Sequence, residues 1–186
     1  NYILIKSKAD ILKNETLLPG FLKTCTSGYD GKGQYVINNK KEIDDLNINF
    51  EKEYILEKKI NLKKEISLIV TRFLDNDCLI YEPIENLHIN QILHKSVIPA
   101  AIDKKIFSQA QEQAKLLAEK LDYIGTMCIE YFIDENNNLL LNEIAPRVHN
   151  SGHLTINAYN ISQFENHIRA ICNLEKVSLK KNYNAE

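Results

Sequence analysis

Short apolar runs separated by turn residues dominate the chain, and most of these runs predict β-strands. The strongest strand prediction is EISLIVTRFL, and the turn DND after it predicts an antiparallel return through CLIYEPI. Shorter runs predict strands at YILI, FLKT, QYVI and EYILEKKI. Strands do not alternate regularly with helices, and the order of elements indicates two small α/β units with antiparallel strands. We therefore predict an α+β fold rather than a doubly wound parallel sheet.

Capping residues and apolar stripes predict the helices. The side chains that begin them are Ser7 for residues 8–13, Asn39 for residues 40–46, Asp103 for a helix through residue 121 and Ser162 for the last helix. The helix after Asp103 is expected to bury the stripe formed by Ile106, Ala110, Ala114, Leu117 and Leu121. The last helix is expected to turn Phe164, Ile168 and Ile171 inward.

The run GTMCIEYFID, the polar turn DENNN and the run LLLNEI predict a β-hairpin. If this hairpin is symmetric about its turn, Glu130 and Glu143 lie opposite each other and share one face, with Cβ atoms about 5 Å apart. Two like charges destabilise a hairpin unless a cation lies between them. Mg²⁺ binds a few carboxylates and completes its shell with phosphate oxygens and water. The alternative is an acidic pair that faces solvent.

Polar groups continue from this hairpin into the segment LNEIAPRVHNSGH. It combines the carboxylate of Glu143 with Arg147, two histidines, Asn150 and Ser151, and Pro146 interrupts the strand before them. These side chains are therefore expected to lie close together where the chain leaves the sheet, as in a binding site.

A glycine-rich segment, SGYDGKGQ, separates the predicted strands FLKT and QYVI. Its backbone has the freedom to surround phosphate oxygens with N–H groups, and Lys32 within it adds positive charge. The spacing is neither that of a P-loop nor that of a dinucleotide-binding motif, and a strand rather than a helix follows. A flexible hairpin tip is the alternative, although Lys23 just upstream favours phosphate binding.

The composition is that of an ordinary globular protein, with 44% hydrophobic and 26% charged residues. A net charge of -2 argues against a broad positive electrostatic field that would attract nucleic acid or an acidic membrane. The four cysteines have no metal-finger spacing, and neither a membrane span nor a signal peptide is visible, which favours the cytoplasm. Because the chain opens on Asn1, we expect it to be part of a longer protein.

Taken together, FLKT, GYDGKGQ, EKKI, Glu65 and NEIAPRVHNSGH resemble the ATP-grasp enzymes, most closely the N5-carboxyaminoimidazole ribonucleotide synthetases of bacterial purine synthesis. The resemblance covers nearly the whole chain. It implies two α/β subdomains that grip a nucleotide: a small lid subdomain at residues 1–57 and a large subdomain at 58–176. Residues 177–186 would begin a carboxy-terminal domain, and an amino-terminal domain would precede the chain.

The same resemblance implies roles for individual residues. The implied ATP-binding residues are Lys23, Gly28, Tyr29, Asp30, Gly31, Lys32, Gly33, Gln34, Glu57, Lys58, Lys59, Ile60, Glu65, His88, Asn142 and Glu143. The implied Mg²⁺ ligands are Glu130 and Glu143. The residues implied to line the place where bicarbonate and the amine substrate meet are Arg147, His149, Asn150 and Ser151.

The resemblance implies ATP-dependent carboxylation of 5-aminoimidazole ribonucleotide by bicarbonate, through carboxyphosphate, in a homodimeric enzyme. Two alternatives stay open: another ATP-grasp carboxylase or ligase, and an ATP-binding module without catalysis. The second alternative is motivated by the absent flanking domains and by two departures from the family pattern. Ser27 stands where the family usually has glycine, and Cys25 where it often has arginine.

Overall fold

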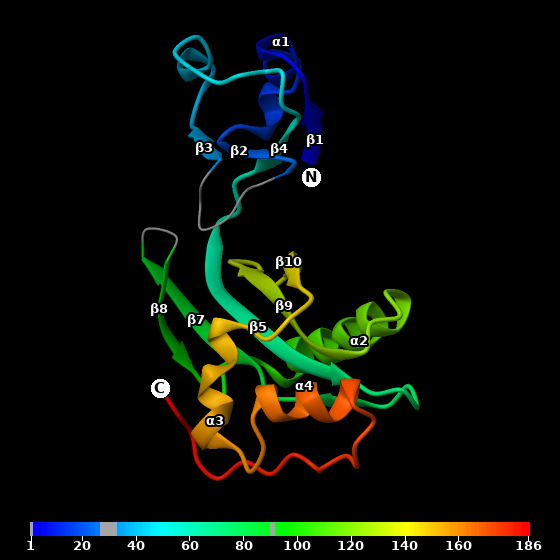
Figure 1. The fold of residues 1–186 in the computed structure, drawn as a ribbon. Helices are drawn as coiled ribbons and strands as arrows, with labels where there is room; N and C mark the ends of the chain where they lie inside the picture. The colour runs from blue at the N-terminus through cyan, green and yellow to red at the C-terminus, as the bar shows by residue number, and fades with distance from the viewer. Residues whose placement is uncertain (1, 27–32, 90–91) are drawn as a thin grey trace. The chain divides into compact units, whose positions relative to one another are not determined.

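The computed structural model of the chain describes residues 2–26, 33–89 and 92–186. The chain forms two compact units, residues 1–61 and 62–186 (Figure 1). Both units contain antiparallel sheets, in agreement with the predicted α+β class. The boundary that we predicted, at residue 57, lies within the last strand of the first unit.

The first unit is a four-stranded antiparallel sheet with short helices. The strands are β1 (Tyr2–Ile5), β2 (Gly20–Thr24), β3 (Gln34–Ile37) and β4 (Tyr54–Lys58), in the order β1-β4-β2-β3. The helices are α1 (Lys8–Lys13) and the 3₁₀ segments η1 (Glu15–Leu17) and η2 (Lys40–Ile43). The predicted caps Ser7 and Asn39 are confirmed, because each side chain accepts a backbone hydrogen bond from its helix. A small apolar core, which includes Ile11, Leu22 and Leu56, holds the sheet and helices together.

The second unit is built on a six-stranded antiparallel sheet. Its strands are β5 (Leu62–Arg72), β6 (Cys78–Ile80), β7 (Ile84–Ile89), β8 (Ile92–Val97), β9 (Gly125–Asp134) and β10 (Leu139–Ala145). The order is β10-β9-β5-β7-β8, and β6 pairs with β5. The β5–β6 return and the β9–β10 hairpin agree with the predictions. Strands β7 and β8 were not predicted, because polar residues such as Asn86 and Ser96 interrupt their apolar pattern.

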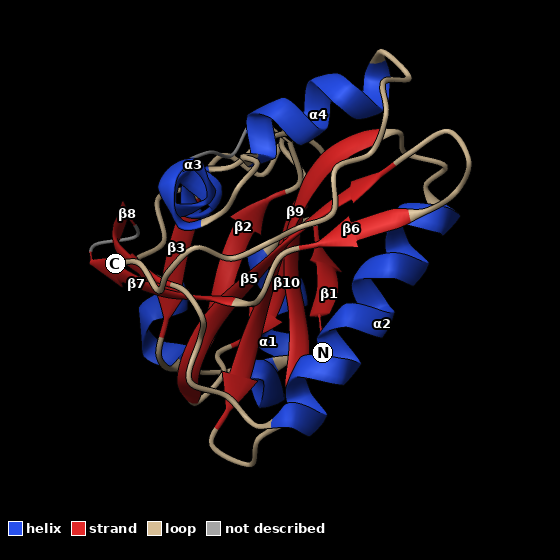
Figure 2. Ribbon diagram, turned by 90° about the horizontal axis from the view of Figure 1, so that it is seen from below, coloured by secondary structure: helices blue, strands red, loops and turns tan. Residues whose placement is uncertain are grey.

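The alternation of side chains along β5 divides the second unit into two layers. Ile66, Leu68 and Val70 pack into the core that also contains helix α2 (Lys104–Lys120). Ser67, Ile69 and Thr71 point to the opposite face. That face is covered by η3 (Asn150–Leu154), α3 (Thr155–Ala158) and α4 (Gln163–Ile171). Figure 2 shows α2 on one side of β5 and β9, with α3 and α4 on the other.

Helix α2 agrees with the prediction except at its end. Ile106, Ala110 and Ala114 are buried as expected, but Leu121 is 53% exposed. Ala118 continues the buried stripe one turn after Ala114, while Leu121 already lies at the C-cap. Asp103 occupies the N-cap without a capping hydrogen bond from its side chain. Among the described residues, no helix combines the length and the apolar character needed to cross a bilayer.

The predicted inner face of α4 is wrong. Phe164, Ile168 and Ile171 are exposed, and the buried side chains are Gln163, Asn166 and Ala170. Both buried amides make hydrogen bonds to distant segments: Asn166 Nδ2 donates to the Tyr81 hydroxyl at 2.8 Å, for example, although Asn166 Oδ1 has no partner among the described residues. Polar groups that make hydrogen bonds can be buried at little cost in free energy. The spacing of apolar residues along α4 therefore does not identify the face that packs inward. The predicted cap is confirmed, because Ser162 Oγ accepts from the Glu165 amide.

Candidate functional site

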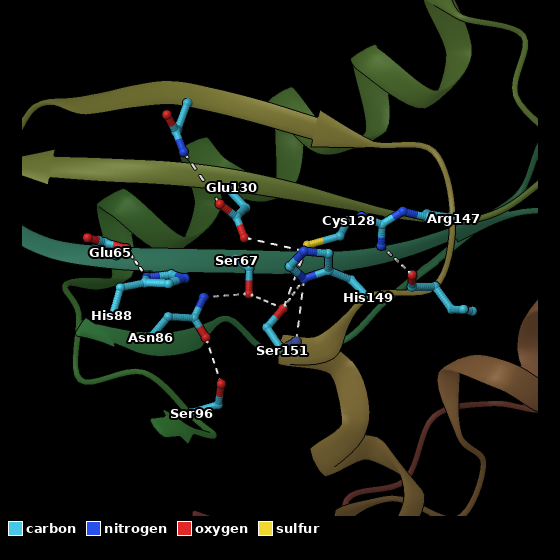
Figure 3. Close-up of polar contacts among 12 residues, drawn as sticks. Glu65, Ser67, Asn86, His88, Ser96, Cys128, Glu130, Arg147, His149 and Ser151 are labelled. Carbon is cyan, nitrogen blue, oxygen red and sulfur yellow. Dashed lines mark hydrogen bonds and ion pairs between the residues drawn. The ribbon is translucent and has the colours of Figure 1, made fainter. Parts of the chain in front are cut away.

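Polar side chains from four segments gather on the sheet face that η3 covers (Figure 3). Strands β5, β7 and β9 contribute alternate residues to this face, because every second side chain of a strand points the same way. The residues are Glu65 and Ser67 on β5, Asn86 and His88 on β7, Cys128 and Glu130 on β9, and His149 and Ser151 from the loop after β10. The second unit therefore carries a mostly buried polar cluster on one face of its sheet.

Glu130 and Glu143 are opposite each other on β9 and β10, as predicted. The reason differs from the assumed symmetry. Nearer the turn, Leu141 pairs with Tyr131, and the register then shifts so that Glu143 pairs with Glu130. Asn142 is the extra residue of this β-bulge. Without the bulge, Asn142 would occupy the position across from Glu130.

The carboxylate of Glu130 is held in an environment that disfavours its charge. Burial, and then the nearby Glu143 carboxylate, raise the pKa of Glu130 above its ordinary value. Two groups oppose this effect on the pKa of Glu130: the charge of His88, and Asn142, whose Nδ2 donates to Glu130 at 3.4 Å. His149 Nε2 lies 3.6 Å from the other carboxylate oxygen. A cation placed between the two acids would relieve their repulsion, and their oxygens are of the kind that Mg²⁺ prefers.

Gln163 holds the backbone of His149 in place. Its amide nitrogen donates to the His149 carbonyl at 2.7 Å, and its amide oxygen accepts from the His149 N–H at 3.1 Å. Gly152 lies against this amide, with no room for a larger residue. The His149 side chain is mostly buried, and burial lowers its pKa to about 4. His149 is therefore a neutral imidazole near pH 7.

Arg147 and Asn150, which flank His149, are exposed, whereas Ser151 is completely buried. The Arg147 guanidinium donates to the carbonyl of Val148 at 3.0 Å. The Ser151 hydroxyl accepts from Ser67 at 2.8 Å and lies 2.9 Å from His149 Nδ1. Its buried position suits a residue that orients His149, while the two exposed residues have access to a ligand.

Glu65 and His88 form a close pair between β5 and β7. The Glu65 carboxylate, through this hydrogen bond, raises the pKa of His88 above its ordinary value. Both side chains are mostly buried. An imidazole beside a carboxylate offers both a donor and an acceptor to a ligand.

Replacing Glu65 with glutamine is expected to lower the pKa of His88, because the imidazolium loses its principal partner while its burial remains. The pKa is measured from the pH dependence of the His88 ring proton signals by NMR. Glu85→Gln is the matched control, since Glu85 pairs instead with Lys64 at 2.7 Å. A His88 pKa that does not fall in the Glu65 variant would contradict this assignment.

Cys128, Glu130 and His149 bring one ligand atom each within 4.8 Å of one another. The group is less suited to Mg²⁺ than the paired acids, because Mg²⁺ prefers oxygen ligands. Burial raises the pKa of the Cys128 thiol to about 12, so the sulfur is protonated and is a poor ligand. Cys128 thus belongs to the packing beneath the site.

In the first unit, an ion pair joins two of the residues implied to bind ATP. Lys23 on β2 and Glu57 on β4 share one face of the sheet, and Lys23 Nζ lies 2.5 Å from the Glu57 carboxylate. Lys58 and Lys59, which follow Glu57, are exposed, and Ile60 is half-buried.

The glycine-rich segment is described only at its end. Gly33 has φ 80°, and a Cβ there would lie 2.7 Å from Thr24 Oγ1, so this position requires glycine. Gln34 pairs with Lys23 in the β2–β3 ladder. The other implied phosphate-binding residues lie outside the described residues, namely Gly28, Tyr29, Asp30, Gly31 and Lys32.

Four polar residues of the site were not identified from the sequence: Ser67, Asn86, Ser96 and Gln163. Each stands alone in a strand or helix, far in sequence from the residues that it contacts. Their signal was a polar residue at a position where the periodicity expects an apolar one. In β5, for example, Ser67 shares its face with the buried Ile69.

Comparisons with known proteins identify the family. The ATP-grasp domain family matches residues 1–164. A curated relative from Staphylococcus aureus, N5-carboxyaminoimidazole ribonucleotide synthase, is 46% identical over 173 residues, which are 91% of this chain and 46% of the relative. The chain thus spans about half the length of the curated relatives that it matches.

Two solved structures extend the similarity to three dimensions. The S. aureus N5-carboxyaminoimidazole synthetase complexed with ADP has a TM-score of 0.89 and 42% identity, over 98% of this chain and 50% of that one. The Aspergillus clavatus N5-carboxyaminoimidazole synthase, in complex with ADP and 5-aminoimidazole ribonucleotide, has a TM-score of 0.87 and 29% identity, over 99% and 50%. With its antiparallel sheets, its sequence match and these neighbours, the chain belongs to the ATP-grasp family.

Proposed function

We propose that the chain is the nucleotide-binding core of an enzyme that uses ATP and bicarbonate to carboxylate 5-aminoimidazole ribonucleotide. The observation that carries this proposal is the opposed pair Glu130 and Glu143, with His149 beside it, in a chain of the ATP-grasp family. The relatives named for this reaction support the choice of substrates. The product is N5-carboxyaminoimidazole ribonucleotide, an intermediate of purine synthesis.

The proposed reaction has two steps. A bicarbonate oxygen attacks the γ-phosphorus of ATP, and the bond to the β-phosphate oxygen breaks, which gives carboxyphosphate and ADP. The amine of 5-aminoimidazole ribonucleotide then attacks the carboxyl carbon, loses a proton and displaces phosphate. Phosphoryl transfer of this kind requires mainly positioning and cancellation of negative charge.

The residues fit these requirements. Lys23 and the exposed guanidinium of Arg147 provide positive charge for phosphate and bicarbonate oxygens. Glu130 and Glu143 are the proposed ligands of Mg²⁺, which would neutralise phosphate oxygens when bound. Glu65 and His88 offer an acceptor and a donor for ribose hydroxyls or nearby nucleotide groups. His149 and Asn150 are assigned to the bicarbonate and amine substrates, and Ser151 to the support of His149.

The test uses the protein from the complete reading frame. We expect ADP release to require bicarbonate and to be stimulated by 5-aminoimidazole ribonucleotide, whereas other amines and acids in a substrate panel fail to replace it. Stimulation by a different amine would assign the chain to another ATP-grasp ligase. Calorimetric ATP binding without any bicarbonate-stimulated hydrolysis would support the non-catalytic alternative. From the family resemblance we further infer a cytoplasmic homodimer, which sedimentation and cell fractionation test.

A further inference from the structure

A continuous series of hydrogen bonds crosses the sheet face from β8 to the loop that carries His149 (Figure 3). Ser96 Oγ donates to Asn86 Oδ1 at 2.9 Å, and Asn86 Nδ2 donates to Ser67 Oγ at 3.0 Å. Ser67 Oγ in turn donates to Ser151 Oγ at 2.8 Å. Ser67 and Ser151 are completely buried and Asn86 is 7% exposed, so these groups depend on one another rather than on water.

The direction of donation along this series follows from the two ends of the Asn86 amide. A side-chain amide accepts only through its oxygen and donates only through its nitrogen, whereas a hydroxyl donates one proton in either direction. Asn86 donates to Ser67, so Ser67 directs its own proton onward to Ser151. The Ser151 hydroxyl, already an acceptor from Ser67, has its proton available for a further partner.

That partner is Nδ1 of His149, which lies 2.9 Å from Ser151 Oγ. The backbone N–H of Ser151 also donates to the same nitrogen, at 3.4 Å. A ring nitrogen that accepts from two donors carries no proton of its own. The proton of the neutral imidazole is therefore on Nε2.

Nε2, on the other side of the ring, lies 3.6 Å from Glu130 Oε1. This distance permits electrostatic attraction but is too long for a hydrogen bond. The Nε2–H group therefore has capacity to donate to an oxygen of a bound anion. In this tautomer Nε2 has no lone pair with which to take a proton.

We propose that Ser67 and Asn86 are positioning residues, which act through Ser151 to keep the proton of His149 on Nε2 so that His149 presents a donor to a substrate oxygen. The identity of that oxygen, on bicarbonate or on the carboxyl group of carboxyphosphate, rests on the proposed function. The tautomer itself is a property of the fold. If the hydrogen bonds served only to stabilise the fold, either direction of proton donation along the series would suffice.

Nitrogen NMR of the full-length protein, labelled with ¹⁵N-histidine, reads the tautomer directly. The His149 signals are assigned by their loss in the His149→Gln variant. We expect the wild-type protein to have its proton on Nε2. Asn86→Asp keeps the shape of the side chain but leaves an acceptor where Ser67 needs a donor. The series is then expected to reverse, which moves the His149 proton to Nδ1 and lowers kcat for bicarbonate-dependent ADP release by about tenfold or more, since a wrong tautomer removes the required group.

Thr71→Val is the matched control. It removes a buried hydroxyl pair with Thr126, 2.7 Å long, on the same sheet face but outside the series. It is expected to lower the melting temperature while the His149 proton stays on Nε2.

Ser67→Ala is the second variant, in which loss of the donor to Ser151 gives a mixture of both tautomers. Ser67→Thr is expected to restore the single Nε2–H form.

A wild-type proton on Nδ1 would overturn the proposal, as would an unchanged tautomer in both Asn86→Asp and Ser67→Ala. If Asn86→Asp does not fold, the spectra of the wild type and of the Ser67 variants still test the proposed tautomer. These spectra require no turnover. A protein with its proton on Nε2 that fails to carboxylate 5-aminoimidazole ribonucleotide would contradict the proposed function alone.

Discussion

Replacing Glu143 with glutamine is expected to reduce bicarbonate-dependent ADP release by the full-length enzyme at least about a hundredfold. Glutamine has the shape of glutamate without its charge, so the hairpin and its bulge are retained. The pair Glu130 and Glu143 then offers one anionic ligand instead of two, and the remaining affinity for Mg²⁺ falls. Initial rates at a series of Mg²⁺ concentrations measure both effects.

Glu135→Gln is the matched control for this prediction. Glu135 is an exposed acid in the turn of the same hairpin, and its replacement makes the same chemical change away from the site. Its activity and Mg²⁺ requirement are expected to equal those of the wild type. Equal turnover by the Glu143 variant and the wild type would rule out the paired carboxylates as the catalytic metal site.

Replacing Gly152 with alanine is expected to destabilise the protein by about 1–3 kcal/mol and to lower its melting temperature by several degrees. A Cβ at this position would lie 2.4 Å from Gln163 Oε1 and 2.6 Å from its Cδ. The Gln163 amide cannot easily withdraw, because it makes hydrogen bonds to both the N–H and the carbonyl of His149. The strain therefore passes to the His149 loop, and activity is expected to fall as well.

A double-mutant cycle with Gln163→Ala tests the cause. If the clash with Gln163 dominates, Gly152→Ala costs less stability in the Gln163→Ala background than in the wild type. Calorimetric melting of the four proteins gives the coupling. Asn157→Ala, an exposed change on the neighbouring helix α3, controls for a general effect of alanine in this region. Full additivity of the two substitutions would show that the Gln163 amide is not the obstacle.

The sequence by itself determined the features that depend on neighbours along the chain. Capping side chains, turns and apolar runs identified α1, the β5–β6 return and the β9–β10 hairpin. The motif NEIAPRVHNSGH, which begins in the second strand of that hairpin, led to the ATP-grasp family. These predictions succeed because a turn or a cap needs only a few adjacent residues to specify it.

Other features were decided only by the tertiary structure. The bulge at Asn142 places Glu143 across from Glu130, and the three leucines at the start of β10 do not reveal where the extra residue falls. Helix α4 turns its apolar stripe outward because Gln163 and Asn166 find partners on distant segments. A polar residue is buried only when its partner is present, and a single segment does not contain that partner.

The alignment of His149 has the same physical origin. Ser67, Asn86 and Ser96 come from three strands, and they meet because the ladders β5–β7 and β7–β8 set one register across the sheet. A shift of one residue in either ladder would turn these side chains to the opposite face. The sequence therefore determines which groups are available to the site, while the strand register decides which of them touch.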